Sequence, residues 1–208
     1  MEILRFGKDN NRIAKVPILG RIAPLVLCYS PPGPFRGLAE RHKGCFAKEE
    51  VIFMPESDIE FHRKTAKKCF NEAWDYLDKK SRDAQEERQM LHLAHASRYH
   101  WTLVGTPTNQ AVSDWQVSRI YATLNQPKLA LHFAKSCLET CEKNDLTDTL
   151  HTAYEGMARA HAIGRDYKSA REYVAKAREQ LARLTGLDEE DRKIYSDQIL
   201  ETEKLIGS

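Results

Sequence analysis

The chain has 208 residues, 41% of them hydrophobic, and its formal net charge at pH 7 is +2. This length suits one domain with an appendage, and so small a net charge argues against a dedicated nucleic-acid binder. The five cysteines, an odd number in a chain that is not small, argue against a secreted disulfide framework. The longest apolar stretch, residues 16–29, is interrupted by two prolines, a glycine and an arginine and is too short for a bilayer. We therefore expect a cytoplasmic protein that binds neither nucleic acid nor membrane.

Residues 1–55 differ in composition from the rest of the chain. They hold six of the eight prolines and half of the glycines, and residues 1–50 carry nine Lys/Arg against five Asp/Glu, a net charge of +4. Proline removes a backbone donor and stops helices. We expect an irregular, basic N-terminal extension, in which Ile3–Phe6, Leu25–Tyr29 and Val51–Met54 could form short strands.

Residues 56–208 are expected to form a helical domain of about seven helices joined by short turns, which make neighbouring helices antiparallel. The first runs from an N-cap at Ser57 or Asp58 to about Lys79. The others cover residues 84–104, 109–124, 127–144, 147–163, 166–184 and 188–205. Pro127 suits a first helical position, and Gly164 is expected to be a C-cap in the left-handed conformation. The last helix is charged and reads as a terminal cap.

A spacing of forty residues recurs in the second half of the chain. Tyr121, Ala130 and Ala134 are echoed by His161, Ala170 and Val174, each forty positions later (161 − 121 = 40). In both copies a helical run, a short break and a second helical run follow each other, as in helix-hairpin repeats. Such repeats stack into solenoids with a concave binding face.

These residues resemble the tetratricopeptide pattern of large and small side chains, which covers residues 109–182 well and 57–104 poorly. The first matching set is Val117, Ser118, Tyr121, Ala130, Ala134 and Cys137. The second is Tyr154, Met157, Ala158, His161, Ala170, Val174 and Ala177. The period is longer than the family's, and Asp114 stands where an aromatic residue is expected. The chain is also similar to uncharacterised bacterial proteins with a tryptophan helix like Trp115–Tyr121, a resemblance that implies no activity.

The tetratricopeptide resemblance implies that the first helix of each pair lines the groove, which places Val112, Trp115, Arg119, Glu155 and Arg159 there. Arg119 and Arg159 are one repeat apart, so they should project into the same groove, where two planar guanidinium groups suit a carboxylate or phosphate. The other interpretation is that both arginines pair with nearby carboxylates such as Asp114 and Glu155. We expect a non-enzymatic module, without a cofactor, that binds a protein or peptide segment, and an acidic segment would suit the arginines.

Two other functions stay open. His92 and His95 are three residues apart on one face of a helix, and His62 or an acid of the first helix could complete a metal or catalytic site. Their helix is apolar on several faces and is expected to be central and buried, so these histidines could equally be interior residues with hydrogen-bond partners. The third possibility is a self-assembling homo-oligomer, because two repeats leave exposed ends.

Cys137 and Cys141 lie four residues apart on a predicted helix. We expect them to be small residues packed between helices. The alternative, a zinc pair, would need further ligands.

Overall fold

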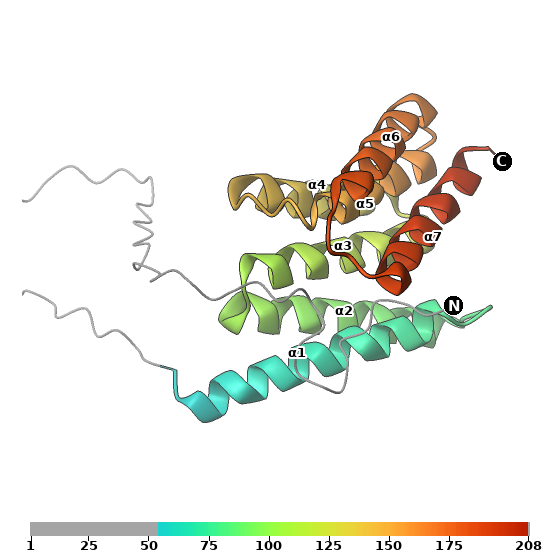
Figure 1. The fold of residues 1–208 in the computed structure, drawn as a ribbon. Helices are drawn as coiled ribbons and strands as arrows, with labels where there is room; N and C mark the ends of the chain where they lie inside the picture. Colours follow the sequence, from blue (N-terminus) through green and yellow to red (C-terminus); the bar gives the residue numbers. More distant parts are fainter. Residues whose placement is uncertain (1–53, 208) are drawn as a thin grey trace, which may run out of the picture.

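The computed structural model describes residues 54–207, and the regular structure of that part of the chain is entirely helical (Figure 1). Its helices are α1 (Glu56–Leu77), α2 (Ala84–Val104), α3 (Pro107–Thr123), α4 (Pro127–Lys143), α5 (Leu150–Ile163), α6 (Tyr167–Arg183) and α7 (Glu189–Ile206). Across residues 54–207 there are thus seven helices and no strand, which confirms the all-α prediction for this range. The strands expected in residues 1–55 fall outside the described residues except for Met54, which belongs to no regular element.

The start of α3 differs from the expected position by two residues. Its N-cap is Thr106, whose hydroxyl accepts a hydrogen bond from the backbone N–H of Asn109 at 3.3 Å, while the Asn109 side chain accepts one from the Thr106 N–H at 3.0 Å. Pro107 then occupies the first helical position, where its missing N–H costs nothing. The sequence Thr-Pro-Thr therefore begins the helix, although it was expected to form the break before it.

The loops after α3, α4 and α5 share one backbone geometry. Asn125, Asp145 and Arg165 have positive φ angles of 54°, 52° and 62°. Each loop closes with a hydrogen bond from the next N–H back to the carbonyl five residues earlier, as from Gln126 to Tyr121 at 2.8 Å. This is the Schellman arrangement, in which the left-handed residue follows the C-cap. The expectation that Gly164 takes the left-handed conformation is wrong. Gly164 is the C-cap, with φ −75°, and the next residue, Arg165, is the left-handed one.

Each helix packs against the next one along the chain, and α1, α3, α5 and α7 also contact one another in succession (Figure 1). Helices α3 and α5 therefore have neighbours on several sides, whereas α4 and α6 bury one stripe. The stripe of α4 is Ala130, Ala134, Cys137 and Cys141, and that of α6 is Ala170, Val174, Ala177 and Leu181. Ala130 and Ala170 are fully buried, as predicted from their small size.

Helix α2 is less central than expected. It buries Met90, Leu93 and Ala94 among its residues, but His92 and Tyr99 are exposed. The central position belongs to α3, which is buried around its whole circumference because α1, α2, α4 and α5 all pack on it. None of the helices in residues 54–207 has an apolar stretch of the length needed to cross a bilayer.

Candidate functional site

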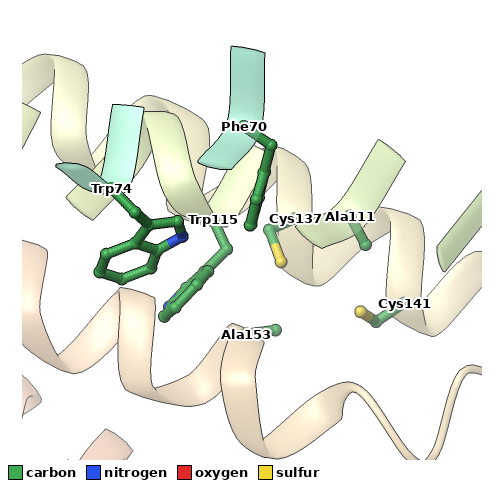
Figure 2. Packing of buried hydrophobic residues seen from close by; sticks show 7 residues of the cluster. All are labelled: Phe70, Trp74, Ala111, Trp115, Cys137, Cys141 and Ala153. Atoms are coloured by element: carbon green, nitrogen blue, oxygen red, sulfur yellow. The ribbon is translucent and has the colours of Figure 1, made fainter. Parts of the chain in front are cut away.

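Trp115 lies in an apolar cluster formed by α1, α3, α4 and the start of α5 (Figure 2). Its members are Phe70, Trp74, Ala111, Trp115, Cys137, Cys141 and Ala153. Val112, which was expected beside the arginines in the groove, is partly buried and packs against this cluster. Both cysteines are fully buried here, which confirms that they are packing residues. A hydrogen bond to Cys141 together with burial raises the pKa of the Cys137 thiol, so the sulfur stays protonated.

The polar edge of Trp115 faces α5. Its indole N–H donates a hydrogen bond of 2.6 Å to Oε2 of Glu155, forty residues later. The helices approach closely at this point because Gly156 has no side chain: a Cβ there would lie 3.0 Å from Cδ1 of Trp115. The hydrogen bond thus fixes how α3 and α5 lie against each other.

Glu155 is the centre of a polar network that reaches α7. Its Oε1 accepts hydrogen bonds from Nε of Arg159 at 2.8 Å and from the hydroxyl of Thr202 at 2.7 Å. Only 3% of the residue is exposed. Burial by itself would raise the pKa of this carboxyl group, but Arg159, Arg119 and the hydrogen bonds outweigh it and hold the pKa below its usual range. Glu155 is therefore ionised at neutral pH.

Arg119 is buried against two tryptophans and two carboxylates. One of its terminal nitrogens, Nη2, donates to Oε2 of Glu201 at 2.5 Å, and Nη1 lies 3.5 Å from Oε1 of Glu155. The guanidinium group also lies 5.4 Å from the ring centre of Trp74 and 5.7 Å from that of Trp115, at cation–π distance. Burial and the nearby Arg159 lower the pKa of Arg119, although an arginine stays charged in proteins. Its Nη1 atom is buried and has no hydrogen-bond partner.

Arg159 joins the same group of charges. Its Nη2 atom lies 3.3 Å from the backbone carbonyl of Gln198 and 3.4 Å from Oε2 of Glu201. Arg119 and Arg159 therefore converge, as their forty-residue spacing predicted. They also pair with Glu155, as expected from the alternative in which both arginines form ion pairs with nearby carboxylates. Asp114 does not take part, because it accepts hydrogen bonds from Arg98 and from the hydroxyl of Ser136 instead.

The residues that sequence reasoning missed come from α7 and α1. Helix α7 supplies Glu201 and Thr202, and α1 supplies Trp74, although α7 was expected to be only a charged terminal cap. Charge balance is a signal that points to one of them, Glu201. Two arginines in an interior need two carboxylates, and the forty-residue pattern offers only Glu155.

A hollow of about 230 Å³ opens beside the two arginines. It is lined by residues of α1, α3, α5 and α7 and by Asp78: Trp74, Leu77, Asp78, Arg119, Thr123, Arg159 and Glu201. Glu201 is the more exposed of the two carboxylates, with 29% of its side chain accessible against 3% for Glu155. The hollow thus combines an aromatic wall with two cations and two accessible carboxyl groups, those of Asp78 and Glu201.

The two histidines of α2 have different surroundings. His95 lies 2.9 Å from the hydroxyl of Tyr121 through Nε2, and its ring packs edge-on against Phe133. Burial, followed by the charge of Arg98, lowers the pKa of His95. His92 is exposed, and His62 lies against His100 rather than against this pair. Within residues 54–207 no three His, Cys, Asp or Glu side chains gather closely enough to hold a metal ion.

Three comparisons of the chain with known proteins gave no match. No protein-family model matches the chain. Neither the curated proteins nor the solved structures give a match.

Proposed function

We propose that residues 56–207 form a tetratricopeptide-like solenoid that works as a non-enzymatic binding module for a protein or peptide segment. Matching contacts in the two central helix pairs, α3–α4 and α5–α6, support this arrangement. The rings of Tyr121 and Phe133 stack with centroids 5.6 Å apart, and those of His161 and Tyr173, forty residues later, stack at the same distance. The buried stripes of α4 and α6 also correspond residue by residue at this spacing.

The binding site in this proposal is the hollow beside Arg119 and Arg159. The observation that carries it is the convergence of the Arg119 and Arg159 guanidinium groups on this hollow, where Oε2 of Glu201 accepts from Arg119 at 2.5 Å and lies 3.4 Å from Nη2 of Arg159. A carboxylate that enters the hollow can take the place of the partly exposed Glu201 and form charge-assisted hydrogen bonds with both arginines. Trp74 would contact an apolar neighbour of that carboxylate. We therefore favour an acidic segment as the partner.

A peptide-binding measurement tests the proposal. The probe is a fluorescently labelled Glu-rich peptide, with a Gln-rich peptide of the same length as its uncharged counterpart, and anisotropy reports binding. Arg159→Ala should weaken binding of the acidic peptide by about 1.5–3 kcal/mol, the range for hydrogen bonds to charged groups. Binding should also weaken as salt rises, because the hollow is open to solvent.

Glu201→Gln separates binding from loss of fold. This variant removes the accessible carboxylate that competes for both arginines, so it should bind the acidic peptide more tightly than the wild type. Arg171→Ala, at an exposed residue of α6, is the matched control and should bind like the wild type. Equal binding of both peptides, or wild-type affinity in both Arg159→Ala and Glu201→Gln, would contradict the proposal.

A further inference from the structure

A pair of histidines faces each other where the start of α1 packs on the end of α2. The Nδ1 atoms of His62 and His100 are 2.6 Å apart, and the ring centroids are 4.9 Å apart. Both side chains are half-buried, so the gap between the nitrogens lies near the surface. This pair is separate from the charged cluster beside Trp115.

Aromatic neighbours hold the two imidazole rings in place. Phe61 packs edge-on against both, with centroid distances of 5.5 Å to His62 and 6.1 Å to His100. Tyr99 packs edge-on against His100 at 5.5 Å. Because Phe61 and Tyr99 are each 60% exposed, they contact the rings without sealing them from solvent.

Two Nδ1 atoms at this distance cannot both carry a proton. In the neutral pair at least one nitrogen lone pair points into the gap, and two neutral imidazoles are good ligands for transition metals. A metal–nitrogen bond of about 2.0–2.1 Å puts two cis ligands about 2.9 Å apart in a square plane and about 3.3 Å apart in a tetrahedron. The observed 2.6 Å is closer to the square-planar value. The two nitrogens therefore need to move apart less to reach the square-planar geometry, which Cu²⁺ prefers, than to reach the tetrahedral one.

We propose that His62 and His100 form a binding site for one Cu²⁺ ion, coordinated through their Nδ1 atoms. Copper also heads the affinity order of the divalent first-row metals for nitrogen ligands. In the described part of the chain no third His, Cys, Asp or Glu joins the pair, so within that part the pair supplies two ligands and water can take the remaining positions.

The test is a titration of the full chain with Cu²⁺ alone, followed by calorimetry and by electron paramagnetic resonance. The wild type should bind one more Cu²⁺ than the His62→Ala, His100→Ala double variant, and its spectrum should show coupling to two imidazole nitrogens. Each single variant should weaken this binding event about tenfold or more. Zn²⁺ should bind the pair more weakly than Cu²⁺.

His132→Ala is the matched control, because it removes an exposed imidazole from α4 and should leave the binding unchanged. The comparison with the double variant also subtracts metal bound by Cys28, His42 or Cys45 of the N-terminal segment. Equal copper binding by the wild type and the double variant would overturn the proposal. A wild-type spectrum without coupling to two imidazole nitrogens would overturn it too, and that result does not depend on how any variant folds.

Discussion

The inner helices α3 and α5 bury polar side chains, whereas the outer helices α4 and α6 bury almost only small and apolar ones. The buried polar residues of the inner pair are Ser113, Asp114, Gln116, Ser118, Arg119, His151, Thr152 and Glu155. The buried stripes of the outer pair contain only alanine, cysteine, valine and leucine. The same domain therefore has two kinds of interior, one held by polar partners and the other by close packing.

The difference follows from how many neighbours each helix has. A helix with one covered face can bury a single apolar stripe, as α4 and α6 do. A helix covered on several sides must bury residues all round, and every polar group among them needs a partner. Gln116 donates from its side chain to the carbonyl of Phe70 at 2.9 Å, and Ser118 donates to the carbonyl of Ala130 at 2.8 Å. Such bonds fix which residues face each other, a constraint that apolar packing does not impose.

The largest effect should come from the centre of the polar interior. Glu155→Gln leaves Arg119 and Arg159 with a single carboxylate, and breaking a buried ion pair costs about 3–5 kcal/mol. Urea unfolding followed by circular dichroism measures the loss. Glu179→Gln, in an exposed ion pair with Arg183 on α6, is the control and should change stability by less than about 0.5 kcal/mol. Similar losses in the two variants would show that the polar interior has no special role.

The second effect concerns a buried histidine of the polar interior. His151 is only 2% exposed and packs on Tyr195 with ring centroids 4.2 Å apart. Burial lowers its pKa from 6.5 to about 4. Because the unfolded chain takes up the proton first as pH falls, the stability from the neutral ring is present above pH 6.5 and is lost between pH 6.5 and 4. The loss amounts to at most about 3 kcal/mol.

Urea unfolding of the wild type and of His151→Leu across this pH window isolates the histidine, since the carboxylates titrate in both proteins. The stability of the variant should fall less steeply between pH 6.5 and 4. If the stabilities of the two proteins fell in parallel with pH, His151 would be protonated in the folded protein as easily as in the unfolded chain. The polar interior would then not exclude a charge at this position.

A third experiment tests close packing on the apolar side. Ala170 is fully buried at the start of α6, so Ala170→Leu should overpack the contact and cost about 1–3 kcal/mol. Thermal unfolding should show a lower midpoint. Ala84→Leu, at an exposed position that begins α2, should melt like the wild type. An Ala170→Leu protein with the wild-type midpoint would show that α6 has room beside it.

The smallest effect belongs to a loop outside both interiors. Arg165 has a positive φ of 62°, which costs a side chain about 1–2 kcal/mol relative to glycine. Arg165→Gly should therefore raise stability by about 0.5–1 kcal/mol, once the larger entropy of glycine in the unfolded chain is subtracted. Asn125→Gly is the comparison and should gain less, because asparagine tolerates this conformation. A decrease at Arg165 would mean that its side chain contributes more than the strain costs.

The sequence predicted the outer helices well. Apolar residues at the spacing of one helix face indicated the stripes of α4 and α6, and small residues at Ala130 and Ala170 indicated close contacts. The convergence of Arg119 and Arg159 was also predicted from their spacing. The left-handed position after α5 was placed one residue too early, because glycine is the usual residue there and Arg165 stands in its place.

The amino-acid sequence by itself determined that the chain after Pro55 forms helices joined by short turns, since periodicity, caps and turn residues act within a few positions along the chain. Only the tertiary structure decided that Glu201 and Thr202 of α7 complete the cluster around Glu155, that α3 is buried on all sides, and that His62 faces His100. These contacts join helices distant in sequence. They depend on how far each helix is rotated and shifted against its neighbours, which a local pattern of side chains does not record.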